Sequence, residues 1–278
     1  MRPTFPYCFL LFLLPFSSLF AQEPHPIAPS EIHTRLGSQI SKAVETMNQE
    51  KKRSGHESTP KDITVFVTDK PVAPAAHAEQ EDDRSIVSNL NRLSEGNKRF
   101  VSGTPKRKEV AAQRRETVNG QHPYAIVITC SDSRVPPEMI FDESVGQLFV
   151  IRLAGNVVDS LALGSVEYAV EHLHAHTLLV LGHESCGAVK AAAEGGHLPP
   201  NIAAITRRIE PAVAAAKARS ITGPALINEC VKENVHEQIR RTMKNSSILF
   251  DAMVKGELLV LGGIYDLASG KVRFLTGN

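Results

Sequence analysis

Two short apolar runs, each followed at once by a residue that binds soft metals, constrain this chain more than any other feature. Residues 124–129 (Tyr-Ala-Ile-Val-Ile-Thr) precede Cys130, and residues 177–182 (Thr-Leu-Leu-Val-Leu-Gly) precede His183. Such short, nearly unbroken runs are typical of strands buried in a parallel sheet. Open α/β sheets bind ligands at the carboxyl ends of their strands. We therefore expect Cys130 and His183 to share one site.

A third soft ligand follows His183 closely. Cys186 lies in Gly-His-Glu-Ser-Cys-Gly, and the next residues, 187–193, predict a helix. A position near a helix N-terminus lowers the pKa of a thiol, which favours the metal-binding thiolate form of Cys186. A structural zinc usually has four protein ligands, whereas a catalytic zinc has three and one open position. Two thiolates and one imidazole therefore indicate a catalytic metal site.

The hydrophobic pattern predicts an α/β fold, with a mainly parallel β-sheet covered by helices and a helical N-terminal arm. We assign residues 84–278 to one catalytic domain, because this length can bury a substantial core. Strands are expected at 124–129, 147–152, 177–181 and 258–264, with a candidate edge strand at 272–276, and helices at 84–101, 161–174, 201–217 and 224–244.

Four segments together resemble the β-class carbonic anhydrases. They are residues 90–100 (Leu-Asn-Arg-Leu-Ser-Glu-Gly-Asn-Lys-Arg-Phe), 130–138 (Cys-Ser-Asp-Ser-Arg-Val-Pro-Pro-Glu), 149–156 and 182–187. The resemblance runs from about residue 84 to the C-terminus. It implies one zinc ion per subunit, held by Cys130, His183 and Cys186. It also implies reversible hydration of carbon dioxide to bicarbonate and a proton by zinc-bound hydroxide.

The same resemblance implies a role for Asp132 and Arg134, which form a carboxylate–guanidinium dyad in this family. Arg134 would hold Asp132 away from the metal, so that the carboxylate accepts a hydrogen bond from the nucleophile. The family also forms dimers or dimers of dimers, so we expect a homodimer or homotetramer. Related sequences often place a substrate-binding glutamine where this chain has Glu143. The sequence leaves open whether Glu143 or Gln147 contacts the substrate.

Three alternatives stay open at this stage. The chain could be a zinc-binding family member without catalytic activity, although the intact Asp132 and Arg134 argue against this. It could act as a hydrolase on a sulfur analogue of carbon dioxide, which pocket shape would decide. A thiol–disulfide oxidoreductase using Cys130 and Cys186 is disfavoured, because such proteins usually carry Cys-x-x-Cys.

The N-terminus predicts export. Arg2, the apolar residues 7–14 and the small residues before position 22 follow the order of a signal peptide, so residues 1–21 are expected to be removed near Ala21. The mature protein would be periplasmic or secreted. Residues 22–83 are expected to form an N-terminal extension and linker, with a helix after Ser30 and a β-like segment at 63–67.

Charge and hydropathy narrow the expected partners. Arg2 is the sole charged residue of the predicted signal peptide, so its removal lowers the net charge from +1 to 0. A neutral chain gives no reason to expect nucleic acid as a partner. No segment after the signal peptide is long and apolar enough to predict a membrane span. The remaining thiol, Cys230, lies in a helical pattern and is expected to be a buried core residue.

Overall fold

The computed structural model describes residues 79–275. The predicted signal peptide and nearly all of the predicted extension at 22–83 lie outside the described residues. For residues 79–87 the backbone alone is described, as the first turns of helix α2.

A five-stranded sheet of order β2-β1-β3-β4-β5 forms the centre of the molecule. The first four strands are parallel, and β5 is antiparallel to β4 at one edge. The prediction of a mainly parallel sheet is confirmed. The strands are β1 (Ala125–Thr129), β2 (Leu148–Arg152), β3 (Thr177–His183), β4 (Leu259–Tyr265) and β5 (Val272–Leu275).

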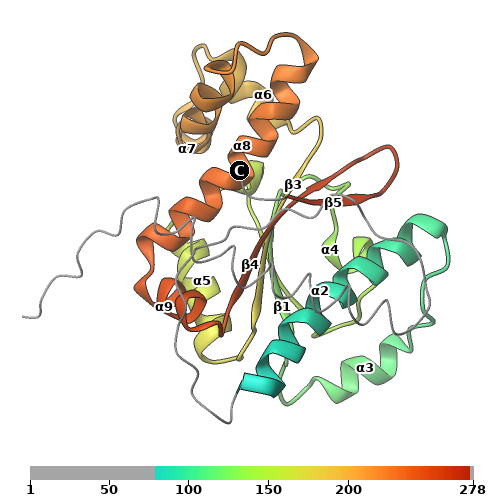
Figure 1. The fold of residues 1–278 in the computed structure, drawn as a ribbon. Helices are drawn as coiled ribbons and strands as arrows, with labels where there is room; N and C mark the ends of the chain where they lie inside the picture. Colours follow the sequence, from blue (N-terminus) through green and yellow to red (C-terminus); the bar gives the residue numbers. More distant parts are fainter. Residues whose placement is uncertain (1–78, 276–278) are drawn as a thin grey trace, which may run out of the picture.

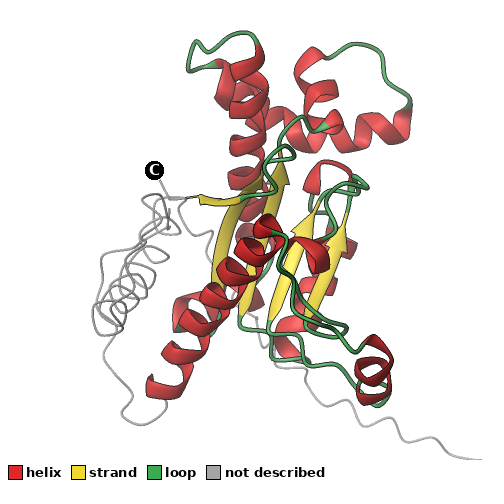
Figure 2. Cartoon of the chain, turned by 90° about the vertical axis from the view of Figure 1, so that its right-hand side faces the viewer, coloured by secondary structure: helices red, strands yellow, loops and turns green. Residues whose placement is uncertain are grey.

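Helices cover both faces of this sheet (Figures 1 and 2). One face is covered by α5 (Ser160–Glu171), α8 (Pro224–Asn245) and α9 (Ser247–Lys255). The other is covered by α2 (Glu79–Ser102) and the short α4 (Pro137–Ile140). Strands β1, β3 and β4 are buried at every position, because both of their faces meet helices.

A group of helices extends beyond the carboxyl ends of the strands (Figure 1). It consists of α6 (Gly187–Glu194), α7 (Pro200–Lys217) and part of α8, which pack on one another. The apolar stripe of α8 includes Val231, Val235, Ile239 and Met243, and Cys230 beside it is fully buried. This confirms the prediction that Cys230 is a core residue.

Several elements differ from the sequence prediction. The helix expected to end at residue 174 ends at Glu171, because His174 has a positive φ of 53° and starts the turn into β3. Helix α9 was not predicted; the Ser246 hydroxyl caps it by accepting from the Leu249 N–H, and Gly256 ends it in the left-handed conformation. Helix α4 and α3 (Val110–Glu116) were also missed.

Helix α2 is fixed to the rest of the domain through Gly96 and Asn97. A Cβ on Gly96 would lie only 1.8 Å from the Phe141 carbonyl oxygen, so only glycine permits this approach. Asn97 donates to the carbonyls of Ile140 (3.2 Å) and Gly270 (2.9 Å) and accepts from the Val272 N–H (2.8 Å). These contacts join α2 to the α4 region and to the β4–β5 hairpin.

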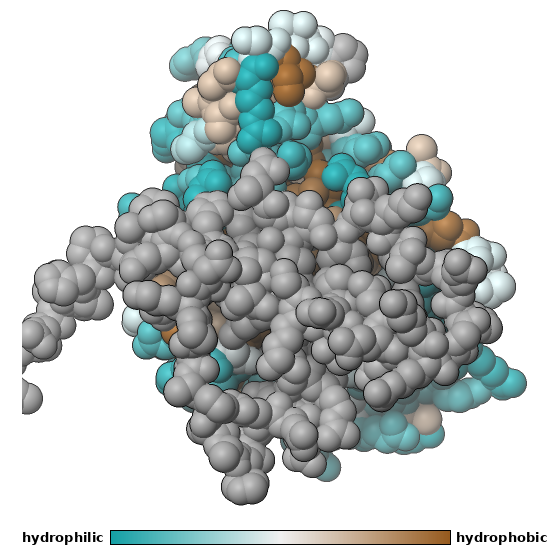
Figure 3. Space-filling view, viewed as in Figure 1, coloured by the Kyte–Doolittle hydropathy of each residue, from teal (hydrophilic) through white to brown (hydrophobic). Residues whose placement is uncertain are grey.

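The described surface carries no candidate membrane span. Within residues 79–275, no helix combines the length and hydropathy needed to cross a bilayer. Where described residues are visible in Figure 3, hydrophilic residues are mixed with scattered apolar ones.

Candidate metal centre

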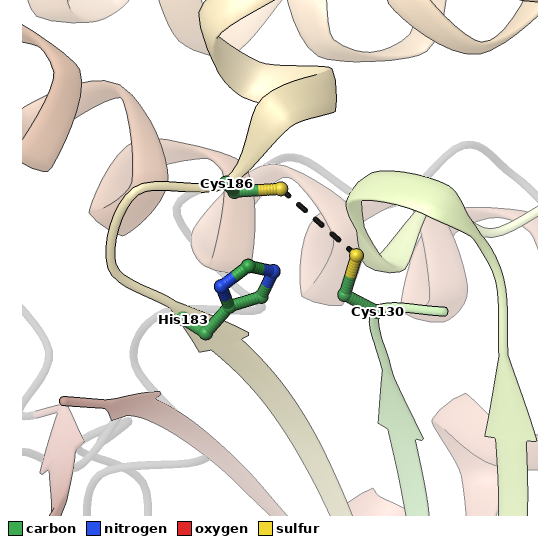
Figure 4. A group of neighbouring side chains, drawn as sticks. All are labelled: Cys130, His183 and Cys186. Atoms are coloured by element: carbon green, nitrogen blue, oxygen red, sulfur yellow. Dashed lines mark hydrogen bonds between the residues drawn. The ribbon is translucent and has the colours of Figure 1, made fainter. Parts of the chain in front are cut away.

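Three side chains from two neighbouring strand ends and one helix start converge at the carboxyl edge of the sheet (Figure 4). Cys130 directly follows β1, His183 is the last residue of β3, and Cys186 precedes the first residue of α6. Their ligand atoms all lie within 4.8 Å of one another, and all three residues are buried. The two sulfur atoms are 4.0 Å apart. The structure therefore brings together the three residues that the sequence predicted to share a site.

The register of the sheet explains this convergence. Strands β1 and β3 are parallel neighbours, and the Thr129 hydroxyl donates to the Leu181 carbonyl across their ends (2.9 Å). After His183 the chain turns through Ser185, which has a positive φ of 54°. The Glu184 N–H donates to the Tyr265 carbonyl (3.0 Å) and fixes this turn. The turn returns Cys186 to the same edge of the sheet.

The His183 ring is oriented for metal binding. Its Nδ1 lies 2.8 Å from the Glu184 carbonyl oxygen. Because a carbonyl only accepts, Nδ1 carries the proton and Nε2 presents its lone pair. Nε2 is buried and has no hydrogen-bond partner among the described residues. A buried acceptor without a partner is costly, and a bound metal ion would satisfy it.

The two thiols share one environment but differ in pKa. The hydrogen bond from the Cys186 thiol lowers the pKa of Cys130 far below the ordinary value, and the neighbouring His183 ring and the Gly155 N–H (3.3 Å from Cys130 Sγ) lower it further. The hydrogen bond to Cys130 and burial raise the pKa of Cys186. The lowering expected from its place at the start of α6 is therefore wrong for the metal-free chain: the N–H groups of Val189 and Ala188 do lower the pKa, but they are outweighed. One thiolate thus forms readily in the metal-free chain, and the second ionises when a metal replaces its proton. Two sulfurs and one imidazole nitrogen fit a soft or borderline metal ion.

Asp132 lies beside these ligands and is held by Arg134. The guanidinium donates from Nε to Oδ1 (2.9 Å) and from Nη2 to Oδ2 (2.7 Å), and the Arg134 backbone N–H also donates to Oδ1 (3.0 Å). Asp132 Oδ2 is 4.0 Å from His183 Nε2. The hydrogen bonds from Arg134 hold the pKa of Asp132 well below its ordinary value. An ionised carboxylate therefore lies at the edge of the ligand cluster.

Comparison with known proteins identifies the family. Residues 125–272, more than half of the chain, match the family model described as carbonic anhydrase. The solved structure of the β-carbonic anhydrase CcaA is 29% identical, with a TM-score of 0.53, and the match covers 66% of this chain and 86% of that one. The chain belongs to the β-carbonic anhydrase family. The resemblance inferred from the sequence motifs is thereby confirmed.

Two further proteins show the same similarity. Carbonic anhydrase 2 of Mycobacterium tuberculosis is 39% identical over 190 residues, which cover 66% of this chain and 90% of that protein. The solved β-carbonic anhydrase of Coccomyxa, in complex with acetazolamide, is 27% identical with a TM-score of 0.54, and the match covers 70% of this chain and 88% of that one. These matches support the assignment of the chain as an enzyme, a carbonic anhydrase.

Sequence reasoning missed Arg152, which supports the ligand loop of this carbonic anhydrase. Its Nε donates to the Cys130 carbonyl (3.1 Å), and its Nη2 donates to the Asp132 carbonyl (2.5 Å). Arg152 ends β2 and is paired in register with Thr129 of β1. The topological argument that located Cys130 could have found it, because Arg152 closes a neighbouring apolar run of the same sheet.

Glu143 and Gln147 lie elsewhere. Glu143 is buried and accepts two hydrogen bonds from Arg92 (2.7 and 2.6 Å) and one from the Tyr124 hydroxyl (2.9 Å). The Gln147 side chain accepts from the same Arg92 (2.7 Å). Tyr124 precedes the first residue of β1, whereas Cys130 follows its last. Within one chain, both residues are bound at the end of β1 opposite to the ligand cluster.

Proposed function

We propose that this carbonic anhydrase catalyses the reversible hydration of carbon dioxide to bicarbonate and a proton, with one zinc ion per subunit held by Cys130, His183 and Cys186. The observation that carries the proposal is the convergence of three buried ligand atoms within 4.8 Å, among which His183 Nε2 has no described hydrogen-bond partner. Three ligands leave one zinc position for water or substrate, as in catalytic zinc sites.

Zinc is the metal that best suits this donor set. Thiolate and imidazole ligands select zinc over the hard cations magnesium and calcium, which prefer oxygen. Bound there, zinc would lower the pKa of a water molecule and so supply a nucleophile for carbon dioxide. The charges of the two thiolates would cancel that of the metal and weaken it as a Lewis acid. We therefore expect activity to rise on the alkaline side of neutral pH.

Asp132 and Arg134 complete the site in this proposal. Arg134 occupies both carboxylate oxygens from one side, so Asp132 stays ionised and is restrained from turning onto the metal. A carboxylate only accepts hydrogen bonds, so Asp132 selects a nucleophile that still carries a proton and orients it toward the substrate. Release of Asp132 from Arg134 would let the carboxylate fill the open metal position and inhibit the enzyme.

The test is stopped-flow hydration of carbon dioxide with a pH indicator, on protein of known zinc content. Wild-type protein should hydrate carbon dioxide, whereas Cys186→Ala should lose both zinc and activity. Cys230→Ala is the matched control, because it removes a buried thiol outside the ligand cluster. Zinc-loaded wild-type protein without activity from neutral to alkaline pH would contradict the proposal and favour a binding protein or a hydrolase of a sulfur analogue.

We also propose that the enzyme is exported to the periplasm or secreted. The support is the order of charged, apolar and small residues in 1–21, which is typical of a signal peptide. Mass spectrometry of protein from the extracytoplasmic fraction of expressing cells should find a mature chain that begins near Gln22. An intact N-terminus, with all of the protein in the cytoplasm, would contradict this.

A homodimer or homotetramer is the proposed assembly. The support is a set of large apolar side chains that are exposed on the single described chain, including Leu161 (80%), Val118 (74%) and Met139 (62%). Contact with another copy of the chain would remove such apolar side chains from water, which favours association. Light scattering after size-exclusion chromatography should give two or four times the chain mass, and a monomer at micromolar concentration would contradict the proposal.

A further inference from the structure

A buried pair of side-chain amides on α8 reaches the ligand cluster through the backbone of one residue, Gly155. Asn234 and Gln238 are fully buried and lie one turn apart on the helix. Asn234 Nδ2 donates to the Gly155 carbonyl (2.8 Å), and the Gly155 N–H donates to Cys130 Sγ (3.3 Å). Gly155 is therefore hydrogen-bonded on both sides, by a helix amide and by a metal-ligating sulfur.

The hydrogen bonds define how both amides are oriented. The Val158 N–H can only donate, so the Gln238 atom that accepts from it (2.9 Å) is the oxygen Oε1. Gln238 Nε2 then donates to Asn234 Oδ1 (2.9 Å) and to the Arg208 carbonyl (3.3 Å). With its oxygen engaged by Gln238, Asn234 must present Nδ2 to Gly155. The chain of bonds thus runs in one direction, from Val158 to the Cys130 sulfur.

Gly155 has a backbone conformation and a packing that a residue with a Cβ could not adopt without strain. It lies in the 3-10 turn η1 (Ala154–Asn156) with φ of 70° and ψ of 23°, which is the left-handed region. A Cβ at this position would meet Ile209 Cδ1 at 2.7 Å and Ala188 Cβ at 3.0 Å. Helices α6 and α7 therefore close over the turn from outside, while Asn234 holds it from α8. This packing aims the N–H at the sulfur.

From this geometry we propose that Asn234 is a positioning residue for the metal centre, with Gln238 as its support. By holding the Gly155 carbonyl, the pair restrains the backbone of this turn and thereby the Gly155 N–H that donates to Cys130 Sγ. That bond withdraws electron density from the thiolate and orients it, and both effects govern how tightly the metal is held. The inference rests on the proposed function, because it requires that Cys130 binds a metal ion. Neither residue touches the substrate or the metal.

The experiment compares cobalt(II) and zinc binding in the full chain and its variants. Asn234→Leu keeps the branching of the side chain but removes the donor to Gly155. Thr242→Val is the matched control, because Thr242 is equally buried on α8 but its hydroxyl donates within the helix, to the Gln238 carbonyl (2.8 Å). The readouts are the thiolate-to-cobalt charge-transfer band and the zinc dissociation constant by chelator competition.

We expect Asn234→Leu to move the charge-transfer band to longer wavelength, because a thiolate without its N–H donor is a better electron donor. Zinc binding should weaken by about 10- to 100-fold, the range typical of groups that support metal ligands. Thr242→Val should leave the position of the band and the zinc affinity unchanged, although Asn234→Leu and Thr242→Val should each lower the melting temperature. Gln238→Met should give a smaller shift in the same direction, and it decides the question if Asn234→Leu does not fold.

The outcomes separate this inference from the proposed function. Wild-type protein that binds neither cobalt nor zinc would overturn both. The positioning role alone would be overturned if wild-type protein binds cobalt but Asn234→Leu or Gln238→Met has the same cobalt spectrum and zinc affinity as Thr242→Val.

Discussion

Two buried polar regions of this domain differ in how their charges are satisfied. In the first, the consecutive residues Asp142 and Glu143 are each paired with an arginine of α2, Asp142 with Arg99 (2.5 Å) and Glu143 with Arg92 (2.6 Å). The second, the ligand cluster of Cys130, His183 and Cys186, gathers buried donor atoms but leaves His183 Nε2 without a described partner. We refer to the first region as the α2 contact.

The difference distinguishes a structural contact from a ligand site. At the α2 contact, each carboxylate has its counter-charges within the chain, because Asp142 Oδ1, which has no hydrogen-bond partner among the described residues, lies 3.1 Å from the Lys108 ammonium. The contact therefore holds α2 in place without another molecule. In the ligand cluster, the atoms that would coordinate a metal point at one another and need an ion to satisfy them. Substitutions in the α2 contact should therefore change stability, and substitutions in the cluster should change metal binding and catalysis.

The largest effect is expected from Cys186→Ala. Removal of one of three ligands should weaken zinc binding by at least about 100-fold, a loss larger than that for groups outside the ligand set. Elemental analysis after dialysis should find about one zinc ion per chain in the wild type, as three-ligand catalytic sites require, and almost none in the variant. Cys230→Ala should keep its zinc. Full zinc occupancy in Cys186→Ala would show that Cys186 is not a metal ligand.

The next largest effect is expected from Asp132→Asn. The variant loses the carboxylate acceptor that orients the nucleophile, so kcat/KM should fall by about 10²- to 10³-fold, as for other groups that act on the transferred proton. Zinc content should not change. Glu138→Gln is the control, because Glu138 is an exposed carboxylate of the same segment. Equal losses in the two variants would show that charge near the site, not the Asp132 position, is responsible.

At the α2 contact, Asp142→Asn should destabilise the fold without affecting catalysis. Breaking a buried ion pair costs about 3 kcal/mol. Burial alone would raise the pKa of Asp142, but Arg99, the Lys106 N–H and Lys108 outweigh it and lower the pKa to about 2. Its contribution is therefore full above the ordinary value of 3.8 and is lost as pH falls through about 2.

Urea unfolding at pH 7 and at pH 2.5 measures this effect. The difference between wild type and Asp142→Asn should shrink at the lower pH. A difference that is independent of pH would show that packing, not charge, is what the variant disturbs. A loss of hydration activity in zinc-loaded Asp142→Asn would show that the two regions are not separate.

The smallest effect is expected from Glu143→Gln. Its partner Arg92 is 40% exposed, so water screens the lost charge and the free energy of unfolding should fall by only about 1 kcal/mol. The value of kcat/KM should stay within about twofold, because Glu143 is bound to Arg92 and Tyr124 at the far end of β1. A tenfold loss of kcat/KM with zinc retained would instead place Glu143 in contact with substrate.

The sequence predicted the sheet well because its strands are buried on both faces. Runs such as 124–129 and 177–182 carry no polar residue except at their ends, so a strand was the natural assignment. Elements of the surface were harder to predict. Helix α4 is a single turn of four residues, too short to show a helical period, and α3 has no buried residue to mark one face.

The ligand cluster could be located from sequence because each ligand directly follows or closes a strand, or begins a helix. Of its supports, Arg152 alone could have been located in the same way, because it closes an apolar run. Gly155 donates its backbone N–H to Cys130 Sγ, and Asn234 donates to the Gly155 carbonyl. Contacts made by backbone groups leave no residue pattern in the chain. Asn234 lies in the same helical stretch as Val235, where the pattern indicates only a buried helix face.

We propose that the ligand cluster binds zinc and that this zinc makes the chain a catalyst. The direct test is a titration of zinc into metal-free wild-type protein, with the rate of carbon dioxide hydration measured by stopped flow at each addition. We predict that the rate rises linearly and stops rising at one zinc ion per chain. A rate that is independent of zinc, or full zinc binding without hydration, would contradict the account.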